Sequence, residues 1–237
     1  MKLLLRLSPD LTIKADRTRR RFLRLLKHNL ADALRSHGFD YTIEPGWVRL
    51  VVEAQGGGGS VGGFAGVAAG ESAADVVRRV FGVHSVSLVQ ERPVGTLDEL
   101  VAEAAPFFDA QVRGKTFAVR ARTGGTAPFR GHDIEVALGA RLAPLGRVKL
   151  VGPEATCHVE VRDGHAYLFN ESLPAQRGLP IGSEGRAVSL ISGGFDSAVA
   201  SWMILRRGAA LDYVFCRLGG AMHQQGTLRV LQVLAER

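Results

Sequence analysis

The chain has 237 residues, of which 46% are apolar, so it is long and apolar enough to bury a sizeable core in two or three small domains. No run of about eighteen apolar residues occurs, and Arg6 interrupts the apolar N-terminus, which excludes a membrane helix and a signal peptide. We therefore expect a cytoplasmic protein with no membrane partner. The formal net charge is +7, which favours an anionic partner.

The cysteines and histidines predict no metal centre of the zinc type. Cys157 and Cys216 lie far apart and form neither a CxxC pair nor a zinc spacing, so we expect two ordinary core thiols. The seven histidines form no HxxxH or HExxH pair. The sequence thus indicates neither a disulfide scaffold nor a transition-metal site.

The excess positive charge lies in residues 1–35, which hold ten Lys or Arg against three Asp. Residues 2–7 predict a strand, and residues 16–36 predict an amphipathic helix that Asp16 can cap. Apolar side chains repeat at helical spacing on one face: Phe22, Leu23, Leu26, Leu30 and Leu34. Basic side chains share the opposite face: Arg17, Arg20, Arg21, Arg24 and Lys27.

Arginines in the first turns of a helix oppose its dipole, so their number suggests selection for an anionic partner, and nucleic acid fits best. The alternative is a merely solvated basic face. A helix on a membrane surface is disfavoured because the apolar face has the leucine spacing of a packed core.

The first domain is expected at 1–92 with a ferredoxin-like order of elements. A hairpin of strands 41–44 and 48–53 turns around Pro45 and Gly46, a helix covers 72–81, and a strand covers 85–91. With the first strand and helix this is β-α-β-β-α-β. Residues 56–70 are rich in glycine and lack a strand and helix context, so we expect a flexible insert.

The second domain is expected at 93–175. A helix at 97–105 follows Thr96, and the strand in GKTFAVRAR alternates so that Phe117, Val119 and Ala121 face inward. Arg120 and Arg122 face outward, and Lys115 and Arg130 flank the strand. A helix at 134–142 and strands at 148–151, 158–162 and 165–169 follow, with a hairpin turn at residues 163–164. The segment GLPIG at 178–182 then predicts a stiff linker out of this domain.

The stretch AVSLISGGFDSAVA at 187–200 predicts a buried strand to Ile191, a tight glycine turn and a helix that opens at Asp196 and Ser197. Glycines there let successive N–H groups point into one concavity, where Ser192, Ser197 and the helix dipole favour an anion. No lysine follows, which excludes a Walker A loop. The alternative is a strand-to-helix turn with an ordinary cap.

SGGFDS at 192–197 resembles the PP-loop of the ATP pyrophosphatase superfamily, whose members adenylate a substrate oxygen and release pyrophosphate. The resemblance implies that Ser192, Gly193, Gly194 and Ser197 hold the pyrophosphate part of ATP and that Asp196 helps to place Mg²⁺. It adds ATP contacts from Leu190, Ile191 and Phe195. It also places adenine or ribose contacts at Phe215 and Cys216, which end a second strand expected at 213–216; plain strand core is the alternative there.

A basic ferredoxin-like domain is followed in order by KTFAVRAR, GLPIG, SLISGGFDS and YVFCRLGGAMH. Over essentially the whole chain, this order resembles the bacterial tRNA 4-thiouridine synthases, the ThiI family of tRNA sulfurtransferases. The fold class implied is multidomain α/β and α+β. A ferredoxin-like domain and a THUMP domain would precede an incomplete parallel-sheet PP-loop domain, of the adenine nucleotide alpha hydrolase type, at 176–237.

The resemblance implies a division of labour. The first two domains bind tRNA by its phosphates and its shape, through the basic residues named above. The PP-loop domain uses MgATP to adenylate O4 of a uridine, and persulfide sulfur from a cysteine desulfurase displaces AMP to give 4-thiouridine. The family also implies sulfur transfer in thiamine thiazole synthesis and pairing into a homodimer.

The chain departs from the family because it ends at Arg237, inside a helix expected after Leu228. The later strands, the downstream ATP contacts, the active-site cysteine and a rhodanese domain are missing, and neither cysteine aligns with the sulfur carriers. We therefore expect a fragment or truncated homologue and assign it no catalytic residue. A tRNA-binding module without catalysis is the alternative.

Two other enzymes are less favoured. A small-molecule ATP pyrophosphatase would not need basic N-terminal domains. A THUMP methyltransferase would need a GxGxG turn after a strand, which the sequence does not contain in that context.

Overall fold

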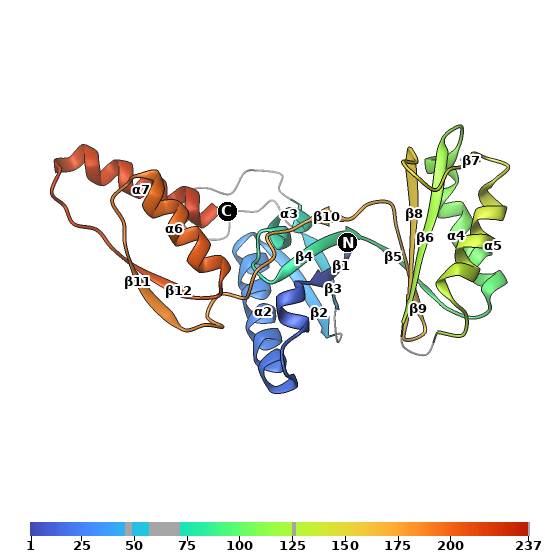
Figure 1. Cartoon of the computed structure of the whole chain (residues 1–237), viewed down its shortest axis with the longest axis horizontal. Coiled ribbons are helices and arrows are strands. Elements are labelled where there is room, and N and C mark those ends of the chain that lie inside the picture. The colour runs from blue at the N-terminus through green and yellow to red at the C-terminus, as the bar shows by residue number, and fades with distance from the viewer. Residues whose placement is uncertain (46–48, 57–71, 125–126, 237) are drawn as a thin grey trace. The chain divides into compact units, whose positions relative to one another are not determined.

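A computed structural model describes residues 1–45, 49–56, 72–124 and 127–236 (Figure 1). The chain forms two compact units. The first combines Leu3–Val86 with Leu173–Arg237, and the second consists of Ser87–Ser172, with Met1 and Lys2 assigned to the first and second unit, respectively. The mixed sheets and helices confirm the predicted α/β and α+β fold class.

The first unit contains a five-stranded sheet in the order β10-β4-β1-β3-β2. Its strands are β1 (Lys2–Leu7), β2 (Phe39–Pro45), β3 (Arg49–Gly56), β4 (Val83–Leu88) and β10 (Leu173–Pro174), and its helices are α1 (Pro9–Thr12), α2 (Asp16–Ser36) and α3 (Ala73–Arg78). The order β1-α2-β2-β3-α3-β4 confirms the ferredoxin-like prediction. The predicted hairpin forms with longer strands than expected, and β10 pairs antiparallel with β4.

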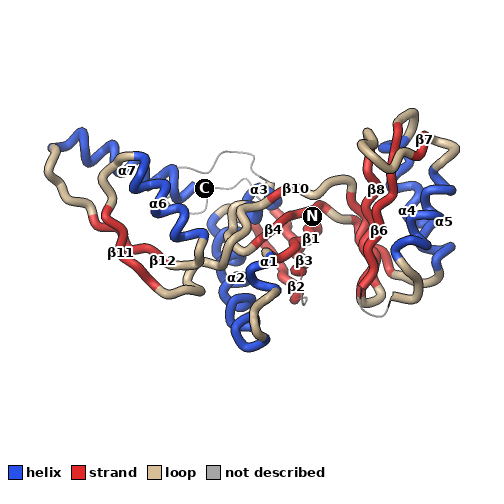
Figure 2. The backbone as a smooth tube through the Cα atoms, viewed as in Figure 1, coloured by secondary structure: helices blue, strands red, loops and turns tan. Residues whose placement is uncertain are grey.

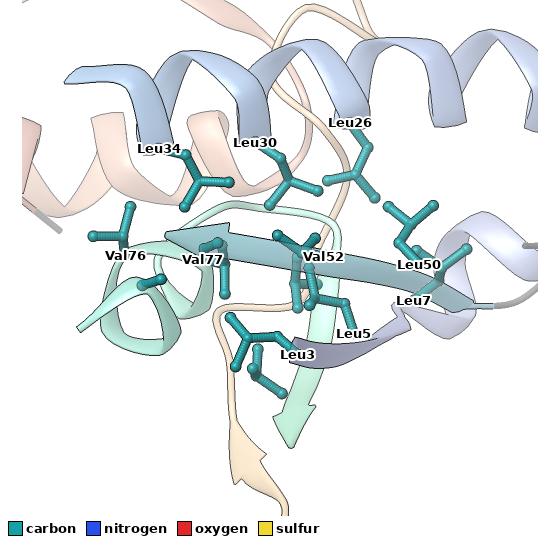
Figure 3. Packing of buried hydrophobic residues seen from close by; sticks show 14 of the residues in the cluster. Leu3, Leu5, Leu7, Leu26, Leu30, Leu34, Leu50, Val52, Val76 and Val77 are labelled. Atoms are coloured by element: carbon teal, nitrogen blue, oxygen red, sulfur yellow. The ribbon is translucent and has the colours of Figure 1, made fainter. Parts of the chain in front are cut away.

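The apolar face of α2 packs on the leucines of the sheet (Figure 3). Four predicted core positions of the helix are at most 1% exposed: Phe22, Leu26, Leu30 and Leu34. Leu3, Leu5 and Leu7 alternate along β1 and belong to the same buried cluster. Burying one such side chain contributes about 1.5–3 kcal/mol, so this face holds the helix on the sheet.

Two details of the first unit differ from the sequence prediction. Asp16 does not cap α2: Ala15 occupies the N-cap, and Asp16 forms ion pairs with Arg19 and Arg20 instead, at 2.6 and 2.7 Å. These pairs form because i, i+3 and i, i+4 residues are neighbours on a helix. Helix α3 ends at Arg78 rather than 81, and Ser72 caps it. The glycine-rich insert lies outside the described residues apart from Gly56, which ends β3, and so do Gly46 and Val48 of the hairpin.

The strand predicted at 85–91 is two strands that join different sheets (Figure 2). Strand β4 ends at Leu88 and β5 (Gln90–Pro93) begins after Val89, and β5 pairs with β9 of the second unit. Only the tertiary pairing separates the two strands. The local sequence predicts extended backbone over the whole stretch, but it does not show that the second part pairs with a different strand.

The second unit is a five-stranded sheet in the order β5-β9-β8-β6-β7, with both helices on one face (Figure 1). Its other elements are α4 (Leu97–Val112), β6 (Thr116–Gly124), α5 (Gly131–Leu142), β7 (Arg147–Val148), β8 (Ala155–Arg162) and β9 (His165–Phe169). Phe117 and Val119 are buried, Ala121 packs on the same core, and Arg120 and Arg122 are exposed, as predicted. Asp163 and Gly164 take φ of 49° and 79°, which confirms the hairpin turn.

The predicted lengths of one helix and one strand in this unit were wrong. Helix α4 runs through Pro106 to Val112 instead of ending at 105, because Phe108 and Val112 continue its buried face. Strand β7 covers only Arg147–Val148, whereas 148–151 was predicted, and Val151 is 84% exposed. Among the described residues β7 pairs only with Thr116 and Phe117 of β6, so the residues after Val148 have no strand partner.

The C-terminal part consists of β11 (Arg186–Leu190), α6 (Phe195–Arg206), β12 (Ala210–Val214) and α7 (Gly220–Glu236). Strands β11 and β12 pair in parallel, in register from Arg186 opposite Ala210 to Leu190 opposite Val214. The prediction of a buried strand was wrong: Val188 and Leu190 are 66% and 71% exposed. Within the described chain β12 is the only strand that pairs with β11, so much of the pair remains open to solvent.

The second strand and the last helix also differ from prediction. Strand β12 ends at Val214, so Phe215 and Cys216 follow it rather than ending it, and α7 begins at Gly220 rather than after Leu228. No helix in the described ranges is long and apolar enough to cross a membrane.

Candidate nucleotide-binding loop and basic surfaces

The glycine loop lies between β11 and α6 and closes onto the first turn of that helix. Ser197 Oγ donates to the Gly194 carbonyl at 3.0 Å, and the Ser192 N–H donates to Ser197 Oγ at 3.4 Å. Gly193 has φ of +78°, in the left-handed region that favours glycine, and Gly194 is the extended N-cap. The predicted strand, turn and helix are therefore present around SGGFDS.

The open side of this loop can donate hydrogen bonds. Within the described chain the N–H groups of Gly193 and Gly194 have no hydrogen-bond partner, and they adjoin the positive end of α6. Ser192, Asp196 and Phe195 are exposed beside them. Such an arrangement suits a phosphate group, and it leaves the Asp196 carboxylate accessible to a cation.

A buried serine fixes α6 on β11 behind the loop. Ser201, 2% exposed, donates from Oγ to the Ser197 carbonyl at 2.7 Å and lies 2.9 Å from Ser189 Oγ of β11. Tyr213 stands opposite Ser189 in β12. Burial raises the pKa of its phenol, against which a hydrogen bond with Ser201 acts. The tyrosine stays neutral, and the loop is anchored by side chains of both strands.

Helix α7 supplies two residues of the site that sequence reasoning missed. His223 Nε2 lies 2.8 Å from the Ser192 carbonyl oxygen. Thr227 Oγ1 lies 2.7 Å from the position that a Cβ on Gly193 would take. The GGAMH segment was noticed in the sequence only as part of a resemblance, and its contact with a loop some thirty residues away depends on how α7 folds back.

The predicted contacts at the ends of the two strands lie at one edge of the sheet. The Ile191 N–H donates to the Val214 carbonyl at 3.0 Å, which joins the first residue after β11 to the last residue of β12. Ile191 is 3% exposed, Leu190 is exposed, and Phe215 is half-buried. The structure thus brings the glycine loop and Phe215 to the carboxyl ends of parallel strands, where ligands of open α/β sheets bind.

The two cysteines have opposite environments. Burial raises the pKa of Cys157, in β8, to about 12, so this thiol is the expected core residue. Cys216 is exposed, and the prediction of a core thiol was wrong for it because it follows β12 instead of lying within the strand.

The basic residues of α2 do not all face solvent alike. Arg17 and Arg24 are exposed, Lys27 is half-buried, and Arg20 pairs with Asp16. Arg21 donates from Nη2 to the Ser183 carbonyl at 2.9 Å and lies 5.1 Å from the centre of the Phe22 ring. Arg21 therefore holds the segment that leads into β11, while the other side chains are available to an anion.

The second unit carries a basic edge around β6 and β7. Lys115, Arg122 and Arg130 are exposed, and Arg120 donates from Nη2 to the Leu150 carbonyl. Sequence reasoning missed Arg147 and Lys149, which are exposed on and just after β7, beside the start of β6. Their signal was the alternation of basic and apolar residues in RVKLV. Basic side chains on the neighbouring strands β6 and β7 can therefore contact phosphates together.

Within the described residues no group of three or more His, Cys, Asp and Glu side chains could hold a metal ion. Asp196 alone offers a carboxylate in the glycine loop. Any Mg²⁺ there would depend on oxygens of a bound phosphate, which is how this ion commonly binds at nucleotide sites.

Three family models match the chain in succession: the ThiI ferredoxin-like domain at residues 2–87, the THUMP domain at 94–171, and thiamine biosynthesis protein (ThiI) at 182–237. Curated tRNA sulfurtransferases match as well, among them those of Escherichia coli O1:K1 and of Shigella boydii serotype 18. Both are 32% identical over 240 residues, covering 100% of this chain and 48% of theirs. The chain therefore spans about half the length of these relatives.

Two solved structures share the fold. PH1313 from Pyrococcus horikoshii has a TM-score of 0.82 at 23% identity, over 100% of this chain and 75% of that one. A 4-thiouridine synthetase, solved as an RNA complex with bound ATP, has a TM-score of 0.73 at 22% identity, over 100% of this chain and 58% of that one.

Proposed function

Because the chain belongs to the ThiI family, we propose that it forms the tRNA-binding and ATP-binding part of a cytoplasmic tRNA sulfurtransferase that makes 4-thiouridine. The observation that carries the proposal is the glycine loop: it lies at the carboxyl ends of two parallel strands, and two of its N–H groups have no partner among the described residues. The two basic surfaces support the choice of a polyanionic substrate.

In the proposed reaction the O4 oxygen of a uridine attacks the α-phosphorus of ATP, and pyrophosphate leaves. Ser192, Gly193, Gly194 and Ser197 hold the departing pyrophosphate through N–H and hydroxyl donors, which stabilises the negative charge that develops on it. Asp196 would hold Mg²⁺ together with the phosphates, and the ion would neutralise part of their negative charge. Leu190, Ile191, Phe195, Phe215 and Cys216 are the proposed contacts to the rest of the nucleotide.

Sulfur then comes from a persulfide that a cysteine desulfurase has charged: its outer sulfur attacks C4 of the activated uridine and displaces AMP. A second thiol then cleaves the S–S bond, forms a disulfide with the carrier cysteine and releases 4-thiouridine. Cys157 is unsuited to carry it, because a buried thiol with a pKa of about 12 is almost entirely protonated at neutral pH. We assign no sulfur carrier to these residues. Sulfur transfer for thiamine thiazole synthesis and pairing into a homodimer belong to the same proposal.

The tRNA would contact basic side chains of both units. Those proposed are Arg17, Arg20, Arg24 and Lys27 of α2, and Lys115, Arg120, Arg122 and Arg130 of the second unit. Arg21, the remaining predicted contact, has a carbonyl partner and would act by orienting its neighbours. Arg147 and Lys149 extend the second surface. Contacts of this kind read phosphate positions rather than sequence, and their strength falls as salt rises.

Pyrophosphate release tests the proposal. The purified chain is incubated with MgATP and with unmodified tRNA, and pyrophosphate is measured against a reaction that lacks tRNA. We expect release that depends on tRNA and is lost in Asp196→Asn. Salt-sensitive tRNA binding without ATP binding or release would instead support the alternative, a tRNA-binding module without catalysis, which the exposed faces of β11 favour.

A further inference from the structure

His223 in α7 contacts two segments that follow different strands. Its Nε2 lies 2.8 Å from the carbonyl oxygen of Ser192, which follows β11. Its ring centre lies 5.0 Å from that of Phe215, which follows β12, with the two planes at 60°. One side chain of the last helix therefore joins the glycine loop to the end of the neighbouring strand.

The contact with Ser192 requires a particular form of the imidazole ring. A carbonyl oxygen only accepts hydrogen bonds, so Nε2 must carry a hydrogen. Nδ1 is buried without a partner in the described chain, and it lies 2.9 Å from where a Cβ on Gly219 would be. A side chain at position 219 would collide with the ring, and a ring with a hydrogen on Nε2 fits this position.

The same contact determines where the next N–H group points. In a trans peptide the C=O and N–H bonds point in opposite directions. Because the Ser192 carbonyl turns toward α7, the N–H of Gly193 turns away from α7, toward the open side of the loop. Holding the carbonyl therefore aims a hydrogen-bond donor at an incoming anion.

Thr227 closes the back of the loop one turn further along α7. It is 2% exposed, and its Oγ1 donates to the His223 carbonyl at 3.0 Å. The 2.7 Å separation from a Cβ position on Gly193 leaves no space for a side chain there. Helix α7 thus holds Gly193 from two sides, by a hydrogen bond and by contact.

We propose that His223 is a positioning residue of the nucleotide site: by donating from Nε2 to the Ser192 carbonyl it aims the Gly193 N–H at a polyphosphate. The identity of that ligand as ATP rests on the proposed function. The hydrogen bond itself does not, because its donor and its acceptor both belong to this chain.

The first test measures the ring in the unliganded chain. Long-range ¹H–¹⁵N NMR spectra of the histidine rings assign the hydrogen to Nε2 or Nδ1, and a coupling across the hydrogen bond connects His223 ¹⁵Nε2 with the Ser192 carbonyl carbon. We expect Nε2 to carry the hydrogen and the coupling to be present. A hydrogen on Nδ1 alone, with no coupling, would overturn the proposal whether or not the protein binds ATP.

The second test uses three variants and calorimetric titration with MgATP and with magnesium pyrophosphate. His223→Gln places an amide N–H near the original Nε2, whereas His223→Asn is too short and His223→Ala has no donor. We expect about tenfold weaker binding of both ligands for Ala and Asn, and less than about threefold for Gln, as for the loss and rescue of one hydrogen bond. Equal affinities in all three variants would contradict the positioning role.

Thermal unfolding of each variant separates positioning from folding. The proposal expects the Gln and Asn variants to unfold at similar temperatures while their affinities differ. If the unaltered chain binds neither ligand, the ATP site of the proposed function fails, and the NMR result still decides whether His223 orients the loop.

Discussion

The two five-stranded sheets and the β11–β12 pair are built from similar apolar strands, but they differ in burial. Leu3 and Leu5 of β1 are fully buried, as are Phe117 and Ala118 of β6, whereas Val188 and Leu190 of β11 are 66% and 71% exposed. Strands β1 and β6 each have a paired strand on both sides, and helices cover one face of their sheets. An apolar strand sequence therefore predicts the strand itself, while its burial depends on how many elements cover it.

The same difference separates the stable parts of the molecule from the candidate site. Side chains in the five-stranded sheets contribute through the apolar area that they remove from water. The glycine loop has little such area, and its geometry depends on a few hydrogen bonds to α6 and α7. Core substitutions should therefore act on folding, and loop substitutions on binding.

The largest expected effect is a difference in thiol reactivity. Cys157 has a pKa of about 12 through burial, against an ordinary 9.0, so the thiolate fraction at neutral pH falls about a thousandfold, while Cys216 is exposed. We expect one thiol per native chain to react with a disulfide reagent, and a second after denaturant is added. Cys216→Ser should abolish the native reaction. Two rapidly reacting thiols would show that the second sheet is open.

The next effect is on folding. Leu30→Ala deletes a side chain that is 0% exposed between α2 and the sheet, and should lower the free energy of unfolding by about 2–5 kcal/mol. The matched change Val188→Ala, in the exposed strand, should cost about 0.5 kcal/mol or less. Denaturant titration by circular dichroism measures both. Similar losses would mean that β11 is covered in solution, and the contrast between the sheets would disappear.

A pair of glycine substitutions tests the loop. Gly193→Ala forces a side chain into positive φ and against Thr227, so ATP binding should weaken at least about tenfold. Gly194→Ala is the control, since its φ of −83° suits any residue and its Cβ position is 3.5 Å from the nearest atom, Ser192 Oγ. Calorimetry with MgATP compares them, and tRNA binding should be unchanged in both. Unchanged ATP affinity in Gly193→Ala would locate the phosphates elsewhere.

The smallest effect is expected on the basic face of α2. Arg24→Gln should weaken tRNA binding by about threefold at moderate salt and reduce the slope of log affinity against log salt by about one, as for one lost phosphate contact. Arg229→Gln removes an exposed cation of α7 outside both basic surfaces and serves as the control. Filter binding over a salt series measures both. An unaltered slope for Arg24→Gln would remove this face from the tRNA site.

Local pattern was sufficient for several features of this chain. Helix α2 covers the predicted residues, and its leucines are buried because the helical period is written into their spacing. The inward and outward residues of β6 and the turn at Asp163 and Gly164 were predictable from alternation and backbone preference. The glycine loop was also predictable, since its donors come from adjacent residues.

Tertiary structure decided what depends on a distant partner. The division of residues 85–91 between two sheets, the exposure of β11 and the exposure of Cys216 follow from which strands pair and which faces are covered. The contacts of Arg21 with Ser183 and of His223 with Ser192 join segments that no local pattern connects. The amino-acid sequence by itself determined the elements and the loop that can bind phosphate. Only packing determined which side chains hold that loop, because a hydrogen bond across such separations needs a folded chain to bring its donor and acceptor together.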